Sequence, residues 1–122
     1  MYEGFIEEGL SLVRAVRERH DGYRRNPWNE VECGGHYVRA MASWGLLNAL
    51  SGFQFDMANR EISFAPVIHE DNFQSFWSTG QAWGTYSQNT TSAGEHEPEL
   101  TVLYGDISGI VVNACGRKWT IS

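Results

Sequence analysis

The hydrophobic period of this chain changes at Ser51-Gly52, and this change restricts the possible folds more than any other feature. Before it, apolar residues recur at every third or fourth position, as they do on one side of a helix. After it, apolar and polar residues alternate in short segments, as they do in β-strands. With 122 residues, of which 42% are hydrophobic, the chain can bury the core of one ordinary domain. We therefore predict an α+β fold with two regions, helical over residues 1–51 and β-rich over residues 52–122.

The helical region should hold two helices that differ in exposure. Residues 3–20 place apolar side chains on one side and charged ones on the other, so this helix should bury a single stripe and end at Asp21-Gly22. A second helix should begin near residues 33–36 and run to Leu50, because Pro27 excludes helix through Asn26. This second helix is apolar nearly all round, so it should be buried on most sides.

Alternating polarity predicts seven strands in the second region. The first four should form two hairpins and the last three a meander, with a polar loop over residues 89–98. The expected strands cover residues 53–55, 62–64, 72–78, 82–88, 100–104, 109–113 and 118–121.

Charge and composition exclude several classes of protein. The net charge of −6 argues against nucleic acid as the main partner. No apolar run approaches the ~20 residues of a membrane span and no signal peptide opens the chain, so we expect no membrane span and a cytoplasmic location. Cys33 and Cys115 follow no metal spacing; we expect two free thiols and no metal or cofactor, although a bridge between them stays open.

Polar residues on the apolar second helix indicate a site. His36, Arg39 and Ser43 share one stripe, and a buried arginine needs a carboxylate or an equivalent acceptor. Glu30 in the preceding loop can supply that carboxylate, and Trp28 beside it can stack on a sugar ring. The alternatives are a structural Glu30–Arg39 ion pair, a core position for Trp28 and a hydrogen-bonding role for His36 in the first helical turn.

No catalytic pair is expected. Glu30 and Glu32 are two residues apart on one segment, so they are poorly placed to bracket a glycosidic bond, and Glu32 can instead stabilise the start of the helix. His20, His69 and His96 are isolated and should face solvent.

The same region resembles a known family. Residues 25–34, Arg-Asn-Pro-Trp-Asn-Glu-Val-Glu-Cys-Gly, and residues 36–44, His-Tyr-Val-Arg-Ala-Met-Ala-Ser-Trp, resemble the C-terminal part of the catalytic region of glycoside hydrolase family 116. That family includes non-lysosomal glucosylceramidases and bacterial β-glucosidases. The likeness extends over residues 1 to about 88, with looser matches at Thr79-Gly80 and at residues 82–85.

The resemblance implies a fold and a role for two residues. Family members carry a toroid of six helical hairpins and hydrolyse β-glycosides with retention, using two carboxyl groups that lie upstream of the matched segment. The chain is therefore expected to be the terminal α-hairpin of the toroid followed by a β-rich tail, without the nucleophile or the acid/base. A glutamate and an arginine nine residues apart bind glycone hydroxyls in the family, and Glu30 and Arg39 have this separation. Some members place a second arginine where this chain has Gly45.

The resemblance leads to two functional hypotheses. The first is a C-terminal fragment of a β-glycosidase that contributes the glycone-binding residues Glu30 and Arg39, with His36 and Trp28, and is inactive alone. Its partners would be a β-glycoside and either the missing part of the toroid or a second copy of the chain. The alternative is a non-catalytic carbohydrate-binding or assembly module.

Overall fold

The computed structural model describes residues 1–25 and 40–122, with side chains described for 1–25 and 44–122. The chain divides into two compact units, Met1–Leu46 and Leu47–Ser122, and each is described by itself. The helices are α1 (Ile6–Arg19) and α2 (Ala40–Ser51). The strands are β1 (Gln54–Asp56), β2 (Glu61–Phe64), β3 (Asn72–Ser78), β4 (Trp83–Thr90), β5 (His96–Tyr104), β6 (Val111–Ala114) and β7 (Arg117–Thr120).

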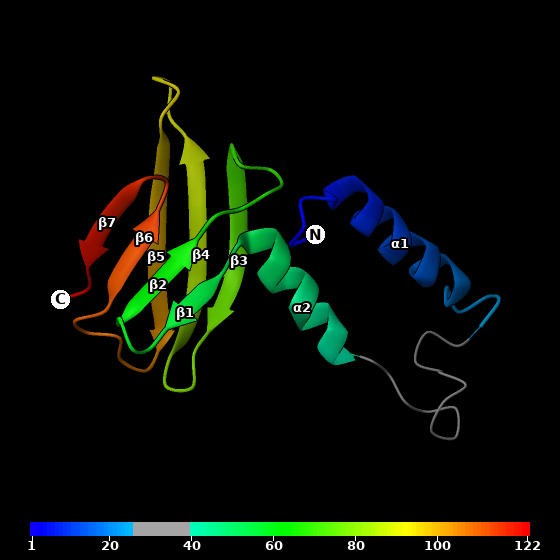
Figure 1. The fold of residues 1–122 in the computed structure, drawn as a ribbon, viewed down its shortest axis with the longest axis horizontal. Helices are drawn as coiled ribbons and strands as arrows, with labels where there is room; N and C mark the ends of the chain where they lie inside the picture. The colour runs from blue at the N-terminus through cyan, green and yellow to red at the C-terminus, as the bar shows by residue number, and fades with distance from the viewer. Residues whose placement is uncertain (26–39) are drawn as a thin grey trace. The chain divides into compact units, whose positions relative to one another are not determined.

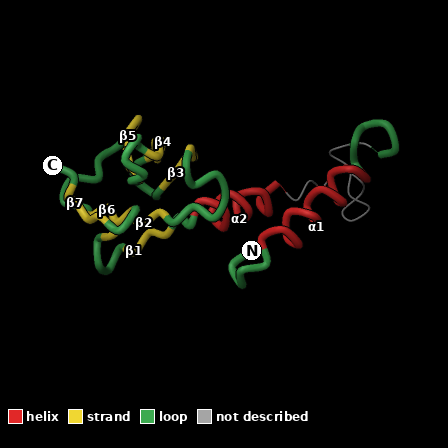
Figure 2. Tube along the Cα trace, turned by 90° about the horizontal axis from the view of Figure 1, so that it is seen from above, coloured by secondary structure: helices red, strands yellow, loops and turns green. Residues whose placement is uncertain are grey.

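The seven strands form two sheets that lie one over the other. One sheet has the order β1-β2-β6-β7 and the other the order β3-β4-β5 (Figure 1). Seen along the strands, the sheets are two separate layers (Figure 2). Neighbouring strands are antiparallel except β2 and β6, which pair in parallel from Glu61↔Val111 to Phe64↔Ala114.

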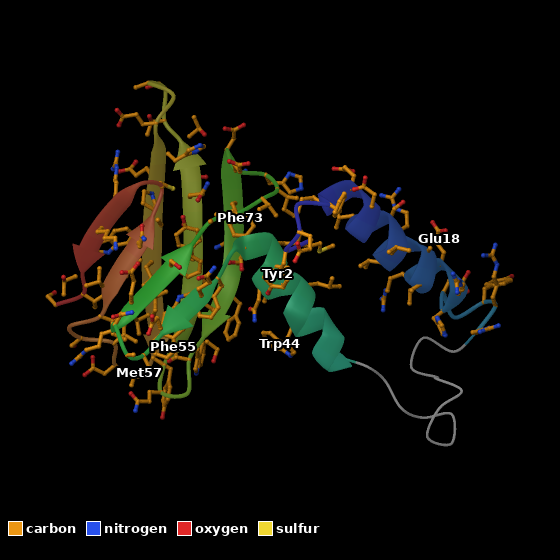
Figure 3. All side chains as sticks on the ribbon, in the orientation of Figure 1. Tyr2, Glu18, Trp44, Phe55, Met57 and Phe73 are labelled. Atoms are coloured by element: carbon orange, nitrogen blue, oxygen red, sulfur yellow. The ribbon has the colours of Figure 1, made fainter. Side chains whose placement is uncertain are left out.

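The core lies between the two sheets. Alternate residues of β3 point inward, so that Phe73, Ser75 and Trp77 are buried. The rings of Phe64 and Tyr86, one from each sheet, stack with centroids 3.9 Å apart and planes 3° apart. The buried cluster comprises Ile62, Phe64, Phe73, Trp77, Ala82, Tyr86, Ile107, Ile110 and Ala114, with half-buried Phe55 packed against it (Figure 3).

The expected fold class is wrong. The described chain is mostly β, with a core between two sheets, and is not a helical hairpin of a toroid followed by a β-rich tail. The physical reason is that each sheet has its own apolar face, and two such faces can bury each other. No residue of α1 is buried, although Ile6, Gly9, Leu10 and Val13 on its expected inner side are half-buried.

The expected meander is also wrong. β5 pairs with β4 in one sheet, whereas β6 pairs with β2 and β7 in the other. Half of the expected polar loop over residues 89–98 is strand, because β4 continues to Thr90 and β5 begins at His96. Short-range alternation identifies strands but does not say which distant strand each one pairs with, so the parallel β2–β6 contact could not be read from it.

The helix ends follow the expected signals. Gly22, after α1, has a φ of 84°, and Gly52, after α2, has a φ of 60°; glycine adopts this left-handed conformation without strain. The expected start of the second helix, residues 33–36, lies outside the described residues. Of the side chains described on α2, Ala49 and Ser51 are buried, but Trp44 is exposed, so this part of the helix is less buried than its composition indicated. The expected boundary between residues 51 and 52 stays a prediction. Within the described chain, no helix is both long and apolar enough to cross a membrane.

Candidate functional site

The four residues expected to bind sugar are not among those described. Trp28, Glu30, His36 and Arg39 all lie in residues 26–39, as does Cys33. Whether Glu30 approaches Arg39 therefore stays a prediction. The described residues provide a different candidate, a polar pocket in the sandwich.

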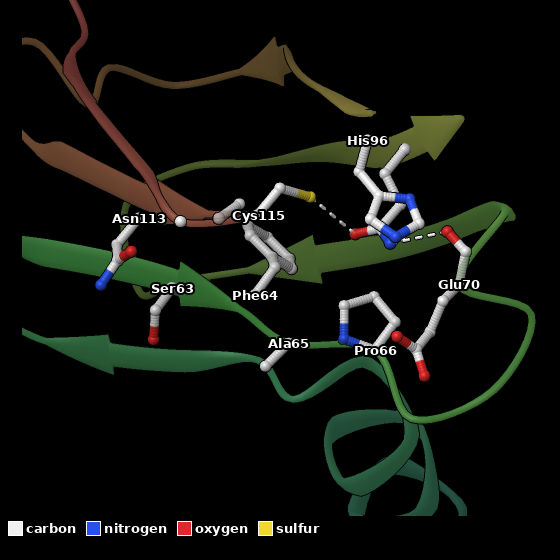
Figure 4. A pocket seen from close by; sticks show the side chains of 11 residues that line it. Ser63, Phe64, Ala65, Pro66, Glu70, His96, Asn113 and Cys115 are labelled. Atoms are coloured by element: carbon white, nitrogen blue, oxygen red, sulfur yellow. Dashed lines mark hydrogen bonds between the residues drawn. The ribbon is translucent and has the colours of Figure 1, made fainter. Parts of the chain in front are cut away.

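This pocket opens at one end of the sandwich and has a volume of about 460 Å³. Both sheets contribute to it: Phe64 and Asn113 come from one, and Gln88 and His96 from the other (Figure 4). The ends of β2, β4 and β6 and the start of β5 meet here, so the pocket marks where the two layers separate.

A tight turn brings Cys115 into the pocket wall. Ala114 and Arg117 are paired across the β6–β7 hairpin, which leaves Cys115 and Gly116 as a two-residue loop. Both have a positive φ, 51° and 70°, the conformation of a type I′ turn. Cysteine is unusual at the first of these positions, and its side chain forms a hydrogen bond inside the pocket.

Gln88 is the centre of a hydrogen-bond network. Its side-chain oxygen accepts a 2.7 Å bond from the Tyr86 hydroxyl and a 3.3 Å bond from the Cys115 thiol. Its Nε2 donates to the backbone oxygen of Glu70 at 2.7 Å (Figure 4). The network therefore ties β4 to the β6–β7 turn and to the loop before β3.

The network keeps Tyr86 in its neutral form. The side chain is fully buried, and this burial raises the pKa of the phenol far above its usual value; the hydrogen bond with Cys115 acts in the same direction. A neutral phenol is a hydrogen-bond donor, as its contact with Gln88 requires. Tyr86 is thus a structural donor rather than a proton shuttle.

His96, which was expected to face solvent, is half-buried and lines the pocket. Its Nδ1 lies 3.2 Å from the Thr90 hydroxyl, which in turn donates to Asp71 at 2.8 Å. The ring is thus held by a β4 residue. In the part of the chain that the structure describes, no group of three or more His, Cys, Asp or Glu residues could hold a metal ion.

Several carboxylates are committed to structural contacts. Hydrogen bonds from Asn59 lower the pKa of Asp56, and those from Ser108 lower the pKa of Asp106. A hydrogen bond from Lys118, with a second from Asn113, lowers the pKa of Glu61. A general acid that cleaves a glycosidic bond needs the opposite shift, so these three groups are not suited to that role.

Sequence reasoning did not identify the Tyr86–Gln88–Cys115 network. One signal was available: alternation over residues 82–88 places Tyr86 and Gln88 on the same face as buried Gly84. A glutamine on an inward face needs hydrogen-bond partners, but the sequence does not reveal that a turn 27 residues later supplies one.

Comparison with known proteins adds no assignment, since neither a family model nor a curated protein matches this chain.

Proposed function

We propose that this chain is the glycone-binding part of a β-glycosidase and does not hydrolyse glycosides by itself. The observation that carries the proposal is the run of residues from Arg25 to Trp44, with its resemblance to glycoside hydrolase family 116. In this proposal Arg39 donates a fixed fork of hydrogen bonds, and Glu30 accepts from adjacent sugar hydroxyls. Trp28 and His36 supply a stacking surface and a further polar contact.

The chemistry of these residue types supports the proposal. A guanidinium and a carboxylate together can donate to and accept from neighbouring hydroxyls of one pyranose, and both interactions are charge-assisted. An aromatic ring next to them can cover the apolar face of the same sugar.

Ligand-observed NMR with methyl β-D-glucopyranoside tests this function. We expect weak, millimolar binding, since a single sugar on one recognition element buries little surface. Arg39→Ala should weaken binding at least tenfold, as expected for the loss of a charged hydrogen bond of ~1.5–3 kcal/mol. Arg39→Lys, which keeps the charge but loses the fork, should recover only part of the affinity.

Matched controls separate recognition from folding. Arg24→Ala removes another arginine, one that donates to the backbone of Glu18 at the end of α1, and should leave binding unchanged. Aryl β-glucoside should not be turned over above background by any of these proteins. Binding that Arg39→Ala leaves intact would show that Arg39 is structural, and turnover lost in Glu30→Gln would show that the chain is itself an enzyme.

A further inference from the structure

The sheet β3-β4-β5 has an outer face that the core does not use. Strand register places four rows of side chains on it, each row crossing the three strands. One end row is Ser78, Trp83 and Tyr104, followed by Phe76, Thr85 and Thr101. The next rows are Gln74, Ser87 and Glu99, and then Asn72, Asn89 and Glu97. We call these twelve residues the outer face.

One end of the outer face is aromatic. The rings of Trp83 and Tyr104 lie 6.1 Å apart, centroid to centroid, with planes 20° apart. Phe76 lies on the other side of Trp83, again at 6.1 Å. Trp83 is 41% exposed and Tyr104 is 66% exposed, so large ring surfaces are open to water. A β-bulge between Trp83 and Gly84 shifts the register, and it is this shift that brings Tyr104 opposite Trp83.

The rest of the outer face is polar and free to bind. Its amides, hydroxyls and carboxylates are exposed or half-buried. Within the described chain, none of the polar side chains of Gln74, Ser87, Asn89, Glu97 and Glu99 has a hydrogen bond or ion pair, unlike Thr90 and Asp71 at the neighbouring strand ends. Both donors and acceptors are therefore available along the length of the face without the loss of an internal contact.

The charges of the outer face restrict its ligand. All twelve positions are described, and none of them is lysine or arginine, whereas Glu97 and Glu99 are both acidic. Such a face repels phosphates, uronic acids and nucleic acid. Polar rows also cover most of it, whereas the core of a stable protein–protein interface is largely apolar.

We propose that the outer face of β3-β4-β5 is a binding site for a neutral oligosaccharide. The aromatic end stacks on the apolar C–H face of a sugar ring, which the negative face of an aromatic ring attracts. The hydroxyls of the following sugars bond to the amides and carboxylates of the polar rows. Because the rows extend along the strands, the site takes a chain of several sugars, and a monosaccharide fills only one end.

This site uses none of the residues of the proposed glycone site, Glu30 and Arg39, and the inference does not rest on the proposed function. The two can be distinguished by ligand and by variant. The outer face requires an oligosaccharide and Trp83, whereas the glycone site requires Arg39 and accepts a single sugar.

Isothermal titration of the whole chain with cellohexaose and with xylohexaose tests the inference. At least one of them should bind, and Trp83→Ala and Tyr104→Ala should each weaken that binding about tenfold. Trp83→Phe keeps a ring and should stay within about threefold of the original affinity. Tyr2→Ala, which removes another exposed tyrosine, one outside the sandwich, should have no effect. Oligogalacturonate, which is anionic, should bind at least tenfold more weakly than the neutral chains.

Three results would overturn the inference. The first is the absence of binding by both neutral hexasaccharides at millimolar concentration. The second is binding that survives both Trp83→Ala and Tyr104→Ala in proteins with unchanged circular dichroism. The third is a concentration-dependent dimer that Trp83→Ala dissolves, because the face would then belong to a second copy of the chain. Since Tyr104 lies exposed at a strand end, its alanine variant keeps the test valid if the Trp83 variant does not fold.

Discussion

At the scale of single residues, buried polar side chains contribute more to the stability of this fold than exposed charged ones. Gln88 is buried to 3% exposure with its amide satisfied from three directions, whereas the ion pairs Lys118–Glu61 and Arg117–Glu95 involve largely exposed lysine and arginine side chains. Exposed pairs contribute little because water and salt screen them. A buried polar atom without a partner costs more, since it loses its hydrogen bonds to water and gains none in return.

Tyr86→Phe should therefore lower the free energy of unfolding by about 1–2 kcal/mol. The substitution keeps the ring stacked on Phe64 but removes the 2.7 Å hydrogen bond to Gln88. Urea unfolding followed by circular dichroism measures the change. Tyr104→Phe removes a hydroxyl from an exposed ring, and its effect should stay below about 0.5 kcal/mol. Equal effects of the two substitutions would show that the network does not stabilise the sandwich.

At the scale of elements, the strands and the β1–β2 and β3–β4 hairpins were predictable, whereas the pairing of the last three strands was not. Alternation identified residues 72–78 as a strand, and β3 has these bounds. It also indicated strands at residues 53–55 and 62–64, where β1 and β2 pair as a hairpin. β5 pairs with the strand before it, β4, whereas the place of β6 in the other sheet depends on its contact with β2, which is distant in sequence.

The junction between α2 and the sandwich depends on Gly52. Its φ is 60°, and a Cβ at this position would lie 2.2 Å from the backbone oxygen of Ala65. The backbone N–H groups of Ala65 and Val67 donate to the last residues of α2, so the segment cannot move away without losing these bonds. Gly52→Ala should therefore lower the free energy of unfolding by at least about 2 kcal/mol.

Gly45→Ala is the matched control for Gly52→Ala. Gly45 lies within α2, and a Cβ there meets nothing within 4 Å. This substitution should be neutral or should stabilise the protein by up to about 1 kcal/mol, because alanine has a higher helix propensity than glycine. Thermal unfolding of both variants provides the measurement. If Gly52→Ala is as stable as the original protein, the backbone at this junction adapts and the close approach to Ala65 is not a constraint.

At the scale of the whole molecule, carboxyl groups with lowered pKa values make the stability of the fold depend on pH. Asp56, Asp106 and Glu61 each have a pKa below the ordinary value, which is 3.8 for aspartate and 4.5 for glutamate. The folded state therefore binds fewer protons than the unfolded state in this range. The stabilisation that these three carboxyl groups contribute is complete above their ordinary pKa values. It is lost as the pH falls through the lower pKa values that they have in the folded state.

The free energy of unfolding should be nearly constant from about pH 7 to pH 5 and should then fall below about pH 4.5. Urea unfolding at a series of pH values measures this dependence. The double variant Asp56→Asn, Asp106→Asn keeps acceptors for the two turns but cannot titrate, so its stability should fall less steeply with acid. If the stability of the double variant falls with acid as steeply as that of the original protein, groups other than Asp56 and Asp106 cause the pH dependence.

The sequence by itself determined the elements and the places where they end. Apolar spacing located α1, single glycines and the Asp21-Gly22 turn ended the helices, and alternation located most strands, because all of these are local properties of the chain. The resemblance of one motif predicted that Glu30 and Arg39 bind a sugar, and this role remains a prediction. The tertiary structure alone decided that β5 and β6 belong to different sheets, that Gln88 meets Cys115, and that Trp83 and Tyr104 form one exposed surface. The physical reason is that these contacts join residues far apart in sequence, and strand register, including a single bulge, sets which side chains meet.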